Sequence, residues 1–122
     1  MRNSDEPKLE PRCLKIDDRW LKLILSGKKT WEIRRANTTI RGRIAFGNIK
    51  TKNYEGYATI TDSLEMKLQE LKKHNDKHQA NAFIDKYAKG RKTLFAWVLE
   101  DVETEPNPKP YTYSTDSWCK TT

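Results

Sequence analysis

The chain has 122 residues, of which 24 are Lys or Arg and 17 are Asp or Glu, so its formal net charge is +7. This length suits one domain and excludes two independent cores of ordinary size. No stretch approaches the roughly 18 apolar residues of a membrane span, and the polar N-terminus lacks a secretory signal. The sequence therefore predicts a cytoplasmic protein that does not bind membranes, with a monomer as the default.

The positive charge is concentrated in the first half of the chain. Residues 1–60 hold 14 basic and 7 acidic residues, whereas residues 61–122 hold 10 of each. Between residues 27 and 52, Glu32 is the single acid among the basic residues of what we call the basic band: Lys28, Lys29, Arg34, Arg35, Arg41, Arg43, Lys50 and Lys52. This segregation favours a polyanionic partner, nucleic acid above all, over an ordinary solvated surface.

The N-terminal half predicts a strand, a helix and three further strands. Residues 1–11 show no period and are expected to form a flexible arm, so the domain is predicted over 12–122. A strand over 12–16 leads into a helix that Asp17 or Asp18 can cap and Gly27 can end. Strands are then predicted over 28–34, 42–49 and 54–61 from their β-formers.

The C-terminal half predicts two helices and a long apolar strand. Leu64, Leu68 and Leu71 have helical spacing, and Asp62 with Glu65 resembles a capping box. A second helical stripe, ended by Gly90, consists of Ala80, Phe83, Ile84 and Tyr87. The apolar run from Leu94 to Leu99 predicts a strand buried on both faces. A proline-limited edge segment and a short strand around Trp118 complete the chain.

No cofactor or metal is expected. Cys13 and Cys119 are far apart in sequence and lack metal-ligand spacing, so reduced structural thiols are predicted. His74 and His78 have i, i+4 spacing, but no third ligand is evident and the intervening residues do not match a catalytic zinc helix. Gly42 and Gly47 are too isolated to form a phosphate-binding loop.

The segment GKKTWEIRR, residues 27–35, combines a strand pattern with five charges. Strand alternation places Trp31 and Ile33 on one face, where they belong to the core. Glu32 and Arg34 are then neighbours on the opposite face, where a carboxylate and a guanidinium can pair and leave donors free for a third group. Lys29 lies at the start of this strand.

Gly27, Lys29, Glu32 and Arg34 fit the G-x-K-x-x-E-x-R signature, and by it the chain resembles ASCH domains. The order of the predicted elements from residue 12 to about residue 120 is also similar to theirs. The resemblance implies an α+β fold with a PUA-like mixed β-barrel and flanking helices. It also implies a cleft that is lined by the signature and that binds RNA or handles nucleotides.

The first functional hypothesis is binding of RNA or a modified nucleotide, with DNA also possible. Phosphates would contact the basic band, and the signature would recognise a base. The predicted binding residues are therefore Gly27, Lys28, Lys29, Thr30, Glu32, Arg34, Arg35, Arg41, Arg43, Lys50 and Lys52. Tyr54, Tyr111, Tyr113 and Trp118 are candidates for base stacking. A second basic cluster, Lys86, Lys89, Arg91 and Lys92, either extends this footprint or is a solvated helix end.

The second hypothesis is an enzyme in the same cleft, with Lys29, Glu32 and Arg34 as the catalytic residues. Some small ASCH proteins that this chain resembles hydrolyse acylated cytidines such as N4-acetylcytidine with a lysine, a threonine and a glutamate. Lys29 matches the lysine, but Glu32 occupies the threonine position, and Thr30, Glu70 and Asp76 are the remaining candidates for the other roles. Ribonuclease activity is a further form of this hypothesis. A third is a protein-interaction module for an acidic partner.

Overall fold

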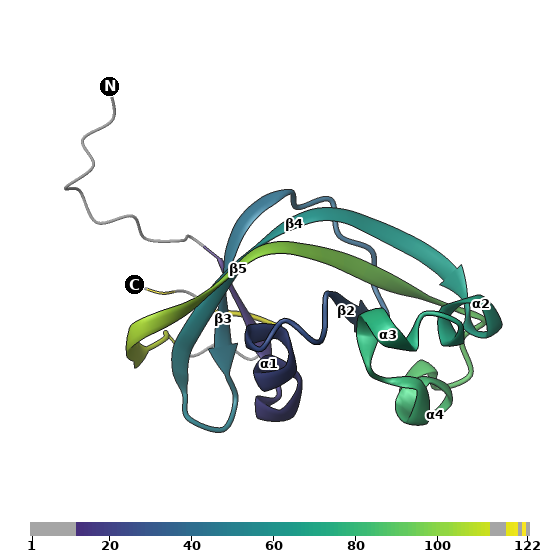
Figure 1. The fold of residues 1–122 in the computed structure, drawn as a ribbon, viewed down its shortest axis with the longest axis horizontal. Helices are drawn as coiled ribbons and strands as arrows, with labels where there is room; N and C mark the ends of the chain where they lie inside the picture. Colours follow the sequence, from purple (N-terminus) through teal and green to yellow (C-terminus); the bar gives the residue numbers. More distant parts are fainter. Residues whose placement is uncertain (1–11, 113–116, 120, 122) are drawn as a thin grey trace.

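The computed structural model describes residues 12–112, 117–119 and 121, and the arm predicted over residues 1–11 lies outside this range. The fold is α+β, as predicted (Figure 1). Its strands are β1 (Cys13–Ile16), β2 (Trp31–Arg34), β3 (Gly42–Asn48), β4 (Asn53–Lys67), β5 (Thr93–Pro110) and β6 (Trp118–Cys119). Its helices are α1 (Asp18–Leu25), α2 (Leu68–Lys72), α3 (Asn75–His78), the short 3₁₀ helix η1 (Asn81–Phe83) and α4 (Ile84–Ala88).

All six described strands belong to one sheet, in the order β2-β5-β4-β3-β1-β6. Strands β1 and β3 are parallel, and the other neighbouring pairs are antiparallel. Strands β2 and β6 are the edges and are not paired with each other, so the sheet is curved and open rather than closed. The predicted PUA-like barrel is therefore correct as a fold class and approximate as a description of the sheet.

Two long strands connect the two ends of the molecule. Strands β4 and β5 run side by side from α2 to the end of the sheet opposite it, as Figure 1 shows. Their register shifts at three places, between Tyr54 and Gly56, between Tyr57 and Thr59, and between Ile60 and Asp62. Such irregularities bend a strand and increase its twist, and they account for the strong curvature of this pair.

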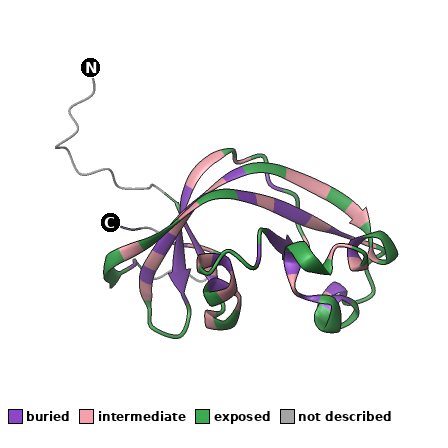
Figure 2. Cartoon of the chain, in the orientation of Figure 1, coloured by how far each residue is buried: buried purple, intermediate pink, exposed green. Residues whose placement is uncertain are grey.

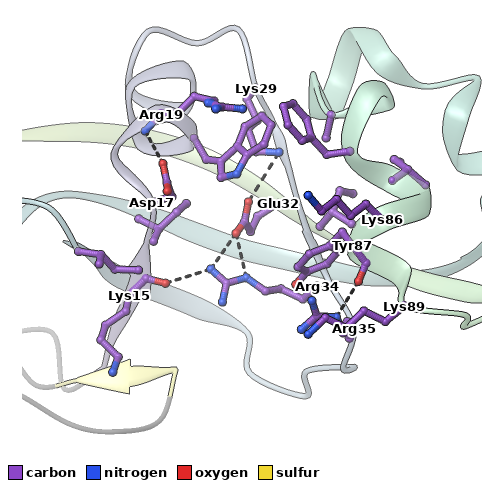
Figure 3. Close-up of a pocket in the computed structure, with 17 residues that line it drawn as sticks. Lys15, Asp17, Arg19, Lys29, Glu32, Arg34, Arg35, Lys86, Tyr87 and Lys89 are labelled. Atoms are coloured by element: carbon purple, nitrogen blue, oxygen red, sulfur yellow. Dashed lines mark hydrogen bonds and ion pairs between the residues drawn. The ribbon is translucent and has the colours of Figure 1, made fainter.

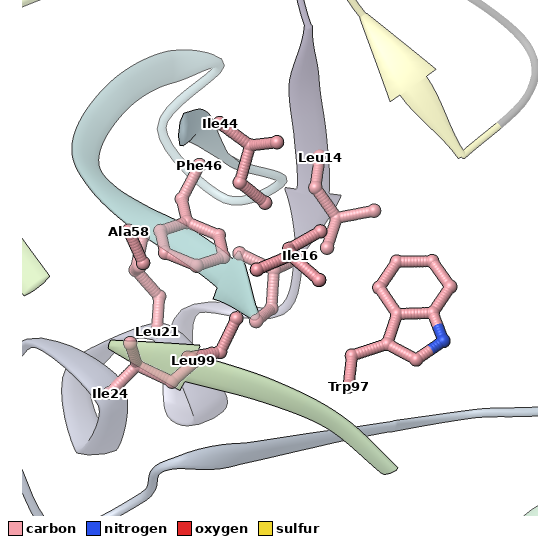
Figure 4. Packing of buried hydrophobic residues seen from close by; sticks show 10 residues of the cluster. Leu14, Ile16, Leu21, Ile24, Ile44, Phe46, Ala58, Trp97 and Leu99 are labelled. Atoms are coloured by element: carbon pink, nitrogen blue, oxygen red, sulfur yellow. The ribbon is translucent and has the colours of Figure 1, made fainter. Parts of the chain in front are cut away.

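The hydrophobic core consists of two main clusters, and their buried residues come mostly from the strands, as the colouring of Figure 2 shows. The larger cluster lies between α1 and the β1–β3–β4–β5 part of the sheet, and it includes Phe46, Leu99 and Trp97 (Figure 4). The second cluster joins Trp31 and Ile33 of β2 to Ile84 of α4 and Leu71 of α2. Trp31 and Ile33 are therefore core residues, as strand alternation predicts.

Helix α1 begins and ends where the sequence predicts. The Asp17 side chain accepts a hydrogen bond from the Arg19 amide at 2.9 Å, which makes Asp17 the N-cap. Gly27 has φ +86° just beyond the C-terminus, and the Gly27 and Lys28 amides donate back to the carbonyls of Ile24 and Leu23. A glycine suits this left-handed position, and the helix therefore stops where the ASCH-like signature starts.

The helix predicted from Asp62 is wrong at its beginning. Strand β4 continues to Lys67, which pairs with Thr93, so Asp62 and Glu65 are strand residues and form no capping box. Leu64, Met66 and Leu68 all pack against the second cluster, and their spacing of two residues is the strand period. Helix α2 begins only at Leu68. The second predicted helix, which carries the stripe from Ala80 to Tyr87, is divided between η1 and α4.

Cys13 and Cys119 are buried thiols that form no disulfide, as predicted, but they are neighbours in space. They are opposite each other in the β1–β6 pair, and the Cys119 thiol donates to the Cys13 carbonyl at 2.9 Å. Hydrogen bonding to Cys119 and burial raise the pKa of the Cys13 thiol, which makes it a poor nucleophile.

No helix in the described part of the chain is long and apolar enough to cross a membrane.

Candidate ligand pocket

A pocket of about 510 Å³ lies between the two core clusters (Figure 3). Its walls come from the end of β1 and the start of α1 on one side and from η1 and α4 on the other, with β2 between them. Seven basic side chains line it: Lys15, Arg19, Lys29, Arg34, Arg35, Lys86 and Lys89. Asp17 and Glu32 are the acids in its lining, so the lining has a net positive charge.

The loop that carries Lys29 is fixed by backbone hydrogen bonds on both sides. The Lys29 amide donates to the Leu23 carbonyl of α1 at 3.1 Å, and the Thr30 amide donates to the Lys77 carbonyl of α3 at 2.8 Å. The Thr30 carbonyl in turn accepts from the Leu99 amide of β5 at 2.9 Å. The short segment after α1 is therefore fixed between three elements, and it directs the Lys29 side chain into the interior.

Lys29 is a buried ammonium, with 1% of its surface exposed. Its Nζ donates to the His78 carbonyl at 2.6 Å and lies 3.6 Å from Glu32 Oε1 and 4.9 Å from the centre of the Trp20 ring. Burial lowers the pKa of this ammonium, and the charge of Glu32 offsets part of the shift. Lys29 thus has several partners within the protein itself.

Arg34 forms the other half of the charged network. Its Nε donates to Glu32 Oε2 at 2.8 Å, and its Nη2 lies 2.7 Å from the same oxygen and 3.0 Å from the Lys15 carbonyl. Glu32 therefore lies between two cations, as its position beside Arg34 on one face of β2 predicts. A carboxylate held in this way is a fixed acceptor, and the guanidinium is held in one orientation.

His78 supports the network from the side away from the pocket. The Ala80 amide donates to His78 Nδ1 at 2.9 Å, so the ring proton is on Nε2, which donates to the Leu71 carbonyl at 2.7 Å. The side chain is fully buried. Burial lowers the pKa of this imidazole, and the positive charge of Lys29 lowers it further.

We expect acid to destabilise the fold through His78. Because the folded-state pKa lies below the unfolded value, the unfolded chain binds the extra proton first as the pH falls below about 6.5. The contribution of neutral His78 to the free energy of unfolding is therefore fully present above that pH. Below it, this contribution decreases by up to about 1.4 kcal/mol per pH unit. Urea unfolding of the wild type and of His78→Gln at pH 7.5 and 5.0 measures this loss. Equal losses in the two proteins would contradict it.

Aromatic rings form one end of the pocket. The Trp20 and Phe83 rings meet edge to face with centroids 5.4 Å apart, and the Arg19 guanidinium lies 4.8 Å from the Phe83 centroid. Phe83 is 41% exposed, and Ile49, also in the lining, is 46% exposed. The pocket therefore combines apolar surface with a few charged groups, as small-molecule sites do.

The structure divides the predicted binding residues into two groups. Lys29, Glu32, Arg34 and Arg35 line the pocket. The lining does not include Gly27, Lys28, Thr30, Arg41, Arg43, Lys50 or Lys52. Two of these have acidic partners, since Arg43 lies 2.7 Å from Glu103 and Arg41 lies 3.7 Å from Asp62. Contact between this second group and RNA stays a prediction.

The structure also adds residues to the site. Lys86 and Lys89 of the second basic cluster line the pocket, as do Lys15, Arg19, Trp20 and Tyr87. The charge of Lys86 and Lys89 is visible in the sequence, but their place beside β2 is not, and there Arg35 Nε donates to the Tyr87 carbonyl of α4 at 2.7 Å. That contact spans 52 residues of chain, which no local pattern predicts.

The predicted stacking residues are not in the pocket lining. Tyr54 and Tyr111 are buried in a third small cluster with Cys13 and Cys119, so the prediction that they are accessible is wrong. Trp118 stacks on Trp97 with centroids 6.1 Å apart, and Tyr113 lies outside the described residues. Alternation along β4 places Tyr54 on the same buried face as Ala58 and Ile60, which makes it a core residue.

The described residues contain no group of three metal-ligating side chains, and the two histidines have separate environments. His74 packs against the Trp31 ring with centroids 5.1 Å apart, whereas His78 is held by the Leu71 carbonyl. Glu70 and Asp76, the candidate catalytic acids, are exposed and do not line the pocket.

Comparison with known proteins identifies the family. A family model described as "ASCH domain" matches residues 14–109. The crystal structure of the ASCH protein from Zymomonas mobilis superposes with a TM-score of 0.72 and 21% identity, covering 81% of this chain and 72% of that one. Two mutant structures of the same protein also superpose with a TM-score of 0.72 and 21% identity. The match to a Tyr-to-Phe mutant covers 81% of this chain and 74% of that one, and the match to a Ser-to-Ala mutant covers 86% of this chain and 77% of that one. A search of curated protein sequences gives no match.

Proposed function

The chain belongs to the ASCH domain family, and from this premise we propose that it binds RNA or a modified nucleotide in the pocket. One observation carries the proposal: the Lys29–Glu32–Arg34 network fixes an acceptor and a guanidinium inside a cavity with a cationic lining. A volume of about 510 Å³ is within the range of small-molecule sites. The predicted cytoplasmic location and the single domain over residues 12–122 are parts of this proposal.

In this proposal the exposed residues Lys50 and Lys52 of the basic band act only on longer RNA. Lys50 and Lys52 are exposed in the turn between β3 and β4, outside the pocket lining, where they can neutralise phosphates of nucleotides that flank the bound one. Such contacts add affinity without reading sequence. DNA would share the phosphate contacts, so the preference for RNA depends on the pocket.

The first test is a fluorescence titration with a mixed-sequence RNA of about 12 nucleotides at several salt concentrations. We expect log affinity to fall linearly with log salt, with a slope of about −0.7 for each phosphate contacted. Lys50→Ala should reduce that slope by about 0.7 and weaken all sequences equally. Absence of binding even at low salt would refute the proposal.

A hydrolase function has one observation in its favour, the lowered pKa of the buried Lys29 ammonium, which makes a neutral, basic amine easier to form. The threonine nucleophile of the acylcytidine hydrolases has no counterpart in the pocket, because the described lining residues include no Ser, Thr or Cys. Thr30 is exposed and lies outside the lining. Incubation with N4-acetylcytidine, followed by chromatography, separates the two functions. Deacetylation that is lost in Lys29→Ala would favour the enzyme.

A further inference from the structure

The pocket has two chemically different ends. Figure 3 shows Arg34, Arg35, Lys86 and Lys89 on one side of it, with Arg19 and Lys29 on the other. The hydrogen bond from Arg35 to the Tyr87 carbonyl joins the end of β2 to α4, and α4 and the residue after it carry Lys86 and Lys89. The opposite end holds the Trp20 and Phe83 rings. We call these the cationic end and the aromatic end.

The cationic end has donors that the protein does not use. Arg34 uses Nε and Nη2 for Glu32 and the Lys15 carbonyl, and its Nη1 has no partner among the described residues. Arg35 uses Nε for the Tyr87 carbonyl and its guanidinium lies 4.1 Å from the centre of the Tyr87 ring, but its two terminal nitrogens have no hydrogen-bond partner in the described part of the chain. Each guanidinium therefore has N–H groups available for a ligand oxygen.

The acids in the pocket lining do not neutralise this end. Glu32 is paired with Lys29 and Arg34, and Asp17 accepts from the Arg19 amide at the start of α1. Neither Arg35, Lys86 nor Lys89 has a carboxylate partner among the residues that the structure describes. Since like charges held together repel, an anion of more than one charge would be stabilised between them.

We propose that the cationic end is a subsite for the dianionic monoester phosphate of a nucleotide or of an RNA end, with the base at the aromatic end. This inference rests on the proposed function and specifies its ligand: a terminal phosphate rather than an internal diester. The unused donors of Arg34 and Arg35 bind the phosphate oxygens, and Lys86 and Lys89 contribute charge from the other wall. A base in contact with Phe83 completes the fit.

The charge of the phosphate decides between the two kinds of ligand. A monoester carries about −1.5 to −2 at pH 7 and has three terminal oxygens, whereas a diester has one charge and two such oxygens. Two forked guanidinium groups can bind three oxygens at once, and the additional negative charge interacts with both lysines. Recognition of the diester would leave part of this end unneutralised.

The test compares three ligands by calorimetry at pH 7.5: a nucleoside 5′-monophosphate, its phosphate methyl ester and the unphosphorylated nucleoside. We expect the monophosphate to bind about tenfold more tightly than the methyl ester, a difference of about 1.4 kcal/mol, and the nucleoside to bind most weakly. Arg35→Gln and Lys86→Gln should remove most of this preference. Lys92→Gln, which removes a charge from an exposed residue outside the lining, should leave the preference intact.

The outcomes separate this inference from the function on which it rests. Equal affinity for the monophosphate and its methyl ester, together with salt-dependent binding of the longer RNA, would overturn the terminal-phosphate subsite and leave RNA binding in place. A preference for the monophosphate that persists in both Arg35→Gln and Lys86→Gln would place the phosphate elsewhere and would also overturn it. Absence of binding by every ligand, RNA included, would refute the proposed function itself.

Discussion

Replacing Glu32 by Gln is expected to destabilise the fold by about 3–5 kcal/mol, the usual cost of removing one partner of a buried ion pair. Glu32 is 4% exposed and is the carboxylate that faces both Lys29 and Arg34. Gln has nearly the same size and keeps one acceptor oxygen, so the loss reports charge rather than packing. Urea unfolding at pH 7 measures it as a lower midpoint with an unchanged slope.

The pH dependence of the Glu32→Gln variant should identify Lys29 as the source of the loss. Without the carboxylate, the buried ammonium is expected to lose its proton in the folded state, while in the unfolded state it keeps its ordinary pKa of about 10.4. The unfolded state then binds one more proton, so stability rises with pH by up to about 1.4 kcal/mol per unit. Between pH 7 and 9 the variant should regain about 2–3 kcal/mol relative to the wild type.

A second substitution provides the control. Lys29→Met in the Glu32→Gln background removes the buried ammonium and retains an unbranched side chain of similar length. Because neutral replacement of a buried ion pair is often without cost, the double variant should be more stable than Glu32→Gln alone. Two results would show that the network is not what stabilises this region. One is a fall in the free energy of unfolding of less than about 0.5 kcal/mol in Glu32→Gln, and the other is a double variant less stable than both Glu32→Gln and Lys29→Met.

The sequence predicts the centre of the site because that part of it is local. Lys29, Glu32 and Arg34 lie within six residues, and the signature and the strand period together place their side chains relative to one another. Helix α1 is equally local, with Asp17 at one end and Gly27 at the other. The structure confirms these local arrangements of side chains and helix ends, whereas the binding role of Lys29, Glu32 and Arg34 stays a prediction.

The rest of the pocket depends on contacts between residues distant in sequence. Lys86 and Lys89 line the same pocket as Arg34 although strands β3 and β4 and several helices separate them in the chain, and Trp20 meets Phe83 across 63 positions of chain. Neither charge nor periodicity contains that information. The incorrect helix start at Asp62 has a different cause, because Leu64, Leu68 and Leu71 fit the helical period while Leu64, Met66 and Leu68 fit the strand period. Pairing with β5 decided between them.

The largest expected effect on binding is that of the double charge reversal Lys86→Glu with Lys89→Glu. Both side chains are exposed and have no carboxylate partner among the described residues, so the fold should be unaffected. The reversal removes two favourable charges and adds two repulsive ones at the pocket. We expect the affinity for a short RNA of about three nucleotides to fall about 100-fold, equivalent to about 2.7 kcal/mol.

The most direct test of the pocket as the ligand site compares this variant with Lys50→Glu/Lys52→Glu. Both double variants change the net charge of the protein by the same amount, but Lys50 and Lys52 lie outside the pocket lining. Titrating the wild type and both variants with the short RNA at one salt concentration should give the roughly 100-fold loss for the Lys86/Lys89 pair and less than about threefold for the Lys50/Lys52 pair. Equal losses, or a larger loss for the Lys50/Lys52 pair, would mean that RNA binds the surface around Lys50 and Lys52 and that the pocket is not its site.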